Sequence, residues 1–195
     1  MSDVKSILLS GVGGQGTILV SKILTQGLVQ KGYDVKMSEI HGMAQRGGSV
    51  STQVRYGSEV HSPIIGLGEA DILVAFEKME AVRYAEYLKT DGVAVINNYE
   101  IMPLPVAAGR ADYPMGLLEA MQAKFKVHTF DAMEVARQVG NIRTMNVVLF
   151  GAMVGAFPDL QTIDWEQVVA DTVPEKFCEV NVQAFRAGRQ MIEER

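Results

Sequence analysis

The residues best suited to bind a ligand form a short run of glycines near the N-terminus. Residues 11–16 read Gly-Val-Gly-Gly-Gln-Gly and match the spacing G-x-G-x-x-G. Glycines let the backbone turn tightly and bring N–H groups close to an anion, and a helix that starts here adds a partial positive charge. This loop could therefore bind a phosphate. The same glycines could equally allow tight strand–helix packing or a subunit contact without any ligand.

A second concentration of polar groups follows the next strand-like segment. Residues 38–49 hold an acid, a histidine, an amide, an arginine and three glycines. Glu39 stands roughly where a ribose-binding acid would stand in a dinucleotide site. His41 could titrate near physiological pH, or it could hold the loop by a hydrogen bond to a backbone carbonyl. We favour the structural role for His41.

Several other kinds of site are excluded by residue type or spacing. Thr17 and Ile18 follow the glycines where a P-loop carries Lys-Ser or Lys-Thr. Asp91-Gly92 and Asn97-Asn98 are similar to pieces of a thiamine diphosphate site, but they lie too close together, and a turn with a polar loop explains them. The one cysteine, Cys178, cannot supply the roughly four thiolates of an iron–sulfur cluster. The chain has three histidines, and neither His61 nor His128 lies near a second candidate ligand in sequence, so we expect no metal site.

The elements that must position these motifs alternate between strand and helix patterns. Such alternation predicts an α/β, Rossmann-like three-layer fold with a largely parallel or mixed sheet and a helical C-terminal segment. Strands are expected at 6–10, 34–40, 50–56, 72–76, 93–96 and 126–130, and helices at 15–30, 77–88, 116–124, 132–139 and from 144 onward, with breaks near Pro158 and Pro174. Both glycine-rich loops should then meet at the carboxyl ends of the strands.

Two smaller patterns refine this expectation. Asp131 should cap the helix that follows it by accepting a hydrogen bond from a free N–H of the first turn. Gly151 and Gly155 lie four residues apart on one helical face, so another backbone can approach there, either in the core or at an interface.

Composition limits the class of protein. Of the 195 residues, 48% are hydrophobic and 21% charged, which suits a globular chain, and we expect a single domain over 1–195. Eighteen basic against 23 acidic residues give a net charge of −5 without a basic cluster, so no nucleic-acid partner is expected. The longest apolar segment, 145–157, is shorter than the roughly 20 residues that cross a bilayer, and no signal peptide is recognisable. We expect a cytoplasmic protein with no membrane partner.

Residues 11–16 and 39–48 together resemble the gamma subunit or domain of the 2-oxoacid:ferredoxin oxidoreductases, most closely the indolepyruvate branch. Residues 71–77 and 144–151 also fit, so the likeness spans most of the chain. The resemblance implies oxidative decarboxylation of a 2-oxoacid with coenzyme A to acyl-CoA, carbon dioxide and reduced ferredoxin. It further implies that thiamine diphosphate and iron–sulfur clusters belong to a large catalytic partner subunit. Ferredoxin would then be a partner of this chain only through the complex. This chain would be an accessory subunit that binds no cofactor and carries no catalytic residue of its own.

On this interpretation, the two glycine-rich loops line an edge of the subunit interface, where they meet a phosphate of coenzyme A or a carboxylate of the partner. The donor fork of Arg46 suits either anion, although Arg46 could instead form an ion pair within the chain. The candidate binding residues are Gly11, Gly13, Gly14, Gln15, Gly16, Gln45, Arg46 and Gly47. Two alternatives stay open: a free-standing dinucleotide-binding protein or small NAD-dependent dehydrogenase, and a purely structural interface protein.

Overall fold

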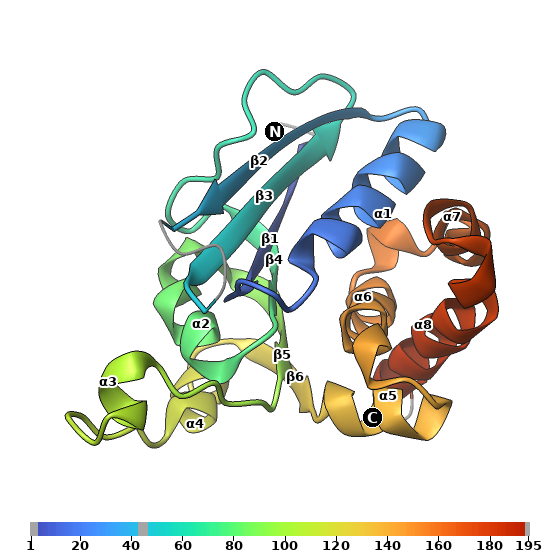
Figure 1. The fold of residues 1–195 in the computed structure, drawn as a ribbon. Helices are drawn as coiled ribbons and strands as arrows, with labels where there is room; N and C mark the ends of the chain where they lie inside the picture. The colour runs from blue at the N-terminus through green and yellow to red at the C-terminus, as the bar shows by residue number, and fades with distance from the viewer. Residues whose placement is uncertain (1–3, 43–46, 194–195) are drawn as a thin grey trace.

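The computed structural model describes residues 4–42 and 47–193, and a six-stranded sheet forms its centre (Figure 1). The strands are β1 (Lys5–Val12), β2 (Asp34–His41), β3 (Ser49–Gly57), β4 (Ala70–Ala75), β5 (Leu88–Asn97) and β6 (Lys126–Phe130). They lie in the order β2-β3-β1-β4-β5-β6. Strands β1, β4, β5 and β6 are parallel, whereas β3 is antiparallel to both β1 and β2. The sheet is therefore mixed, as expected.

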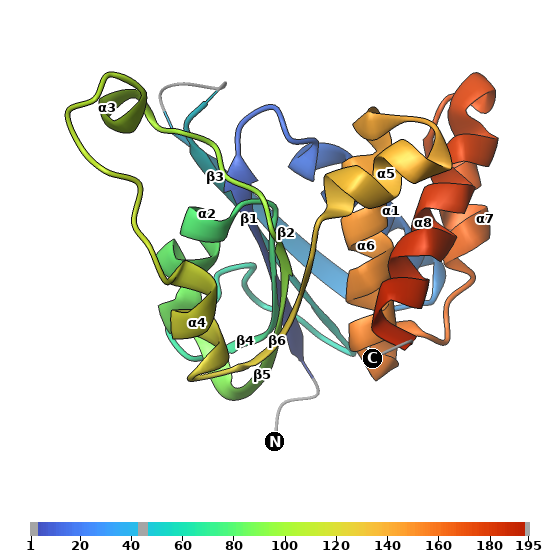
Figure 2. The same cartoon turned by 90° about the horizontal axis from the view of Figure 1, so that it is seen from below.

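Helices cover both faces of this sheet, which Figure 2 shows from below. The α-helices are α1 (Thr17–Gln30), α2 (Lys78–Arg83), α3 (Leu104–Ala107), α4 (Leu117–Gln122), α5 (Ala132–Val139), α6 (Met145–Ala156), α7 (Trp165–Thr172) and α8 (Cys178–Glu193), with 3-10 turns at Ala85–Tyr87, Ile142–Thr144, Pro158–Leu160 and Glu175–Phe177. Helices α1 and α5 to α8 lie on one face, and α2 to α4 lie on the other. The three-layer fold and the helical C-terminal segment are confirmed. In the described part of the chain, no helix is long and apolar enough to cross a membrane.

Each face of the sheet has its own hydrophobic core. Strand β4 shows why, because its alternate side chains enter opposite cores. Ile72 and Val74 join the larger core beneath α1 and α6, while Leu73 and Ala75 join the smaller core beneath α2 and α4. A strand buried on both faces needs a continuous apolar sequence, which is the pattern that predicted this one.

Helices α6 and α8 cross so closely that both need glycine at the crossing. A Cβ on Gly151 would lie 2.0 Å from the carbonyl oxygen of Phe185, and a Cβ on Gly188 would lie 1.9 Å from that of Val148. A Cβ on Gly155 would lie 3.2 Å from the carbonyl oxygen of Arg189, so the helices approach less closely there. The glycine pair on α6 therefore serves packing in the core.

The later elements follow the sequence closely. Strand β6 and helix α5 have the predicted bounds, and the side chain of Asp131 accepts a hydrogen bond from the Glu134 N–H over 2.9 Å. The helical region breaks at Pro158, where a 3-10 turn begins, and at Pro174 after α7 has ended. The predicted helix ends and the predicted cap are confirmed here.

The segment between β4 and β5 departs from the prediction. The helix expected over 77–88 stops at Arg83, and Leu88 already begins β5 with its side chain buried in the smaller core. The turn expected at Asp91-Gly92 lies inside that strand instead. Glycine suits position 92, because a Cβ there would lie 2.7 Å from the Leu88 side chain and 3.0 Å from the carbonyl oxygen of Lys89. Burial of one leucine thus outweighs the local preference for a helix and a turn.

Candidate functional site

The first glycine loop connects β1 to α1 at the carboxyl edge of the sheet. Gly14 and Gly16 have φ values of +106° and +83°, in the left-handed region that disfavours other residues. Gly16 precedes the first residue of α1, and in the described structure no side chain caps this helix and no acid lies in its first turn. The positive end of the α1 dipole is therefore available to an anion.

Gln15 determines the shape of this loop from inside it. Its Oε1 accepts a hydrogen bond from the Val12 N–H over 2.7 Å, and its Nε2 donates to the carbonyl oxygen of Phe76 over 2.9 Å. Both ends of the side-chain amide are thus used within the chain. The predicted helix over 15–30 starts later, at Thr17, because Gln15 ties β1 to the end of β4.

The second glycine-rich loop lies directly against the first. The Gly13 N–H donates to the carbonyl oxygen of Gly48 over 2.8 Å, and the Gly47 N–H donates to that of Gly13 over 3.2 Å. These bonds continue the β1–β3 ladder, in which Val12 is paired with Ser49. The expectation that the two loops meet is confirmed.

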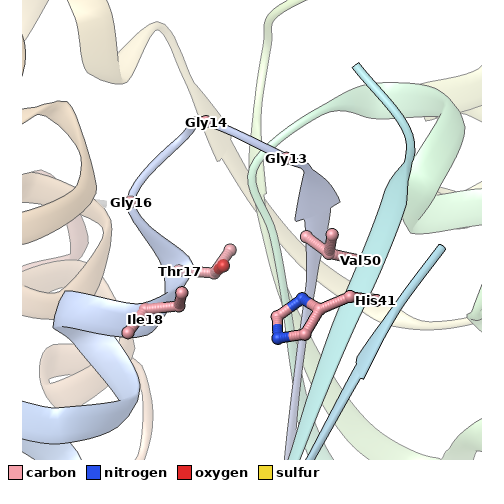
Figure 3. A pocket seen from close by; sticks show the side chains of 7 residues that line it. All are labelled: Gly13, Gly14, Gly16, Thr17, Ile18, His41 and Val50. Carbon is pink, nitrogen blue, oxygen red and sulfur yellow. The ribbon is translucent and has the colours of Figure 1, made fainter. Parts of the chain in front are cut away.

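A pocket of about 310 Å³ lies between the glycine loop, the start of α1 and the ends of β2 and β3 (Figure 3). Its lining residues are Gly13, Gly14, Gly16, Thr17, Ile18, His41 and Val50. The imidazole of His41 points from β2 toward the first turn of α1. Backbone groups, one hydroxyl and one imidazole therefore share the lining with the apolar side chains of Ile18 and Val50, around a space large enough for a small anionic group.

Glu39 holds β2 against α1 rather than facing the pocket alone. Its Oε1 accepts a hydrogen bond from the hydroxyl of Ser21 over 3.0 Å, and its Oε2 lies 3.4 Å from Nε2 of His41. The Glu39 carboxylate therefore lies beside the imidazole of His41, and the hydrogen bond from His41 to a backbone carbonyl stays a prediction.

The sheet order separates Glu39 from the glycine loop. Because β3 lies between β1 and β2, the two parallel strands are about 10 Å apart, two strand spacings. A dinucleotide site uses adjacent strands for the glycine turn and the ribose-binding acid. The geometry therefore does not favour Glu39 as a ribose ligand.

Two buried asparagines from later elements of the chain support the loop. Nδ2 of Asn146, at the start of α6, donates to the carbonyl oxygen of Gly16 over 3.1 Å. Asn97, at the end of β5, donates from Nδ2 to the carbonyl oxygen of Phe76 and accepts from the Ala132 N–H. The signal for Asn146 was its place beside Thr144-Met145 at the start of an apolar helix.

Two buried carboxylates at this edge were missed by sequence reasoning. Glu77 and Glu80 are only 1% and 4% exposed. Glu77 accepts hydrogen bonds from the hydroxyl of Tyr113 and from the Ile101 N–H. Burial, followed by the hydrogen bond to Glu77, raises the pKa of Tyr113 above its usual range. Acids beside a strand end are usually solvated, so only the position of Glu77 directly after Phe76 could have pointed to one of the two.

The candidate binding residues divide into three groups. Gly13, Gly14 and Gly16 line the pocket, and Gly47 is joined to its rim by the bond to Gly13. Gly11 and Gln15 have structural positions, since Gly11 is buried and a Cβ on it would lie 3.0 Å from both Gln15 and Phe76. Gln45 and Arg46 lie outside the described residues.

The described residues contain no group of three or more His, Cys, Asp or Glu side chains placed to hold a metal ion. The two dipeptides that are similar to pieces of a thiamine site, Asp91-Gly92 and Asn97-Asn98, have structural positions. Asp91 lies in β5, and the side chain of Asn97 is hydrogen-bonded to the backbone of Phe76 and Ala132.

Comparison with known proteins gives a consistent result. The profile of the pyruvate ferredoxin/flavodoxin oxidoreductase family matches residues 6–191. The chain is 39% identical over 189 residues to the indolepyruvate oxidoreductase subunit IorB of Thermococcus kodakarensis, with 94% of this chain and 93% of that protein covered. It is 40% identical over 190 residues to IorB of Methanothermobacter thermautotrophicus, covering 94% and 95%. The gamma subunit of a keto/oxoacid ferredoxin oxidoreductase from Geobacter sulfurreducens has a similar structure, with a TM-score of 0.73, 25% identity and coverage of 98% and 99%.

Proposed function

The chain belongs to the pyruvate ferredoxin/flavodoxin oxidoreductase family, and from that premise we propose that it is an accessory subunit of a 2-oxoacid:ferredoxin oxidoreductase. The complex oxidises an arylpyruvate such as indolepyruvate. The substrate loses carbon dioxide, its acyl group is joined to the thiol of coenzyme A, and two electrons pass to ferredoxin. The similarity to two IorB subunits supports the arylpyruvate branch.

The residues of this chain do not fit the redox and thiamine cofactors of that reaction. Cys178 is the one cysteine in the sequence, so a cluster that needs about four thiolates cannot be built from it. We assign these cofactors to the large catalytic subunit. The role of this chain is then to dock on that subunit and to complete an edge of its substrate or coenzyme site.

We propose that the pocket between the two glycine-rich loops receives an anionic group in the assembled enzyme. The supporting observation is that the uncapped start of α1, with Thr17 and Ile18, opens into this pocket beside Gly13 and Gly14. The anion is a phosphate of coenzyme A or a carboxylate of the partner. On the sequence argument, Gln45 and Arg46 contribute to the same contact. Gly11 and Gln15 maintain the shape of the loop.

Hydrogen exchange measured by mass spectrometry separates the two possible anions. The peptide over residues 13–18 is compared in the isolated chain, in the complex, and in the complex with coenzyme A. Protection that appears on assembly supports the partner as the source of the contact, and protection that appears only with coenzyme A supports the coenzyme. Equal exchange in all three samples would exclude the pocket as the contact.

Two further expectations belong to this proposal. One sheet with a core on each face supports a single gamma-type domain. The cytoplasmic location remains a prediction from the sequence. The dinucleotide-binding alternative receives no support from the site, because the acid that it needs lies two strands from the glycine loop and is bonded to Ser21.

A further inference from the structure

A buried carboxylate lies next to the junction of the two glycine-rich loops. The side chain of Glu80 is 5% exposed, and its Oε1 accepts a hydrogen bond from Nε of the half-exposed Arg83 over 3.0 Å. Its Oε2 accepts a hydrogen bond from the hydroxyl of Ser49. Its own N–H donates to the carboxylate of Glu77 over 3.1 Å. The carboxylate is thus held by one cation and one hydroxyl from different elements.

Ser49, the hydroxyl partner of Glu80, lies where the second glycine-rich loop enters β3. Ser49 is the first residue of β3, directly after Gly47 and Gly48, and it is paired across the ladder with Val12. The cross-loop bonds between Gly13 and the pair Gly47-Gly48 begin one residue beyond that pairing. Any shift of Ser49 would therefore move the second loop relative to the first.

We propose that Glu80 is a positioning residue, which acts through the Ser49 hydroxyl to fix Gly47 and Gly48 against Gly13. Helix α2 thereby determines the width of the pocket rim from the opposite face of the sheet. A buried charge is costly unless its partners are well placed, and removing one partner leaves it unsatisfied. The proposal concerns loop geometry, and its effect on coenzyme A rests on the proposed function.

Strand β3 supplies a matched control. Ser51 is two residues along and therefore on the same face of the strand, it is buried, and its Oγ has no hydrogen-bond partner among the described residues. Ser49→Ala removes the bond to Glu80, whereas Ser51→Ala removes a hydroxyl that makes none. Arg83→Gln removes the ion pair of Glu80 and leaves the Ser49 bond available.

The first measurement is amide hydrogen exchange of the full isolated chain. Ser49→Ala should speed exchange of the Gly13 and Gly47 amides about tenfold, as expected when one hydrogen bond to a charged group is lost. Glu80→Gln should act in the same direction. Ser51→Ala and Arg83→Gln should leave both amides unchanged, and exchange in β4 should be unaffected by all four variants. Unchanged exchange at Gly13 and Gly47 in Ser49→Ala would overturn the proposal, as would equal acceleration by Ser51→Ala.

The second measurement uses the assembled enzyme and separates positioning from a general loss of stability. Ser49→Ala should raise the KM for coenzyme A about tenfold, the effect of one misplaced charge-assisted contact, while kcat stays within about twofold. A fall in kcat at unchanged KM would contradict a positioning role. If exchange at the Gly13 and Gly47 amides is faster while KM and kcat are unchanged, Glu80 positions the loop but the pocket does not bind coenzyme A. A failure of the positioning role is thus distinguishable from a failure of the proposed function.

Discussion

The N–H of Gly13 and the carbonyl oxygen of Gly48 are joined by a hydrogen bond of 2.8 Å, although the two residues are 35 positions apart in the chain. This bond joins the loop that follows β1 to the loop that precedes the antiparallel strand β3, so the two loops form one surface. The pocket at the start of α1 lies beside this junction, because Gly13 belongs to both.

Gly16 should tolerate substitution less well than Gly14, the other left-handed glycine of the first loop. Gly14→Ala should lower the unfolding free energy by about 1 kcal/mol, the cost of placing alanine in a left-handed backbone conformation. No steric cost is added, because nothing lies within 4 Å of the Cβ position. Gly16→Ala should cost about 1 kcal/mol more, since a Cβ there displaces Asn146 and breaks its hydrogen bond to Gly16. Urea unfolding measures both values.

A double mutant isolates the Asn146 contribution. In an Asn146→Ala background, Gly16→Ala should cost no more than Gly14→Ala does. Fully additive effects of the Gly16 and Asn146 substitutions would show that the contact does not determine the difference.

Gln15 should stabilise the fold through its half-buried side-chain amide, which is hydrogen-bonded at both ends. Gln15→Glu keeps an acceptor for the Val12 N–H but replaces the donor to Phe76 with a negatively charged oxygen, so we expect a loss of about 1–3 kcal/mol in unfolding free energy. Gln161→Glu is the matched control, because that exposed side chain also donates to a carbonyl oxygen, of Gly155. The control should lose less than about 0.5 kcal/mol. Equal losses would contradict a special role for Gln15.

The crossing of α6 and α8 should respond to added methyl groups in a graded way. Gly188→Ala places a Cβ 1.9 Å from the backbone oxygen of Val148, so the helices must separate and we expect a loss of about 3 kcal/mol or more. Gly155→Ala, whose nearest contact is 3.2 Å, should cost clearly less. Thermal unfolding of the two variants checks the order, and a reversed order would contradict the packing described here.

Arg46 carries the sequence-based part of the anion hypothesis. Arg46→Ala in the assembled enzyme should raise the KM for coenzyme A, or the dissociation constant of the complex, about tenfold or more, as expected for loss of a charged hydrogen bond. Arg186→Ala is the comparison, because that arginine is paired with Glu166 on the outer helices. If neither constant changes in Arg46→Ala, Arg46 has no part in binding.

The sequence predicts the scaffold well where burial and periodicity agree. Strand β6 and helix α5 have the expected bounds, because an apolar run and a capping aspartate mark them independently. The prediction for the segment around Leu88 was wrong. Its local pattern suits a helix, but Leu88 is buried in the smaller core as the first residue of a strand. Local preference cannot reveal which core a side chain will enter.

The site was predictable in its backbone but not in its supporting side chains. Glycine spacing identifies the loop, and strand order then brings the second loop to it. Glu77, Glu80 and Asn97 come from other elements, and their burial depends on packing that no short motif encodes. Gln15 lies in the motif itself, yet only the structure shows that its amide points into the fold.

The central claim is that this chain completes a catalytic complex without a redox centre of its own. The direct measurement is ferredoxin reduction by indolepyruvate and coenzyme A, assayed with the purified chain alone, with its catalytic partner alone, and with both mixed, together with iron and NAD analysis of the purified chain. We predict an iron-free, NAD-free and inactive chain that restores full activity to the partner. Turnover of an oxoacid by the chain alone, or its isolation with bound NAD, would contradict the account.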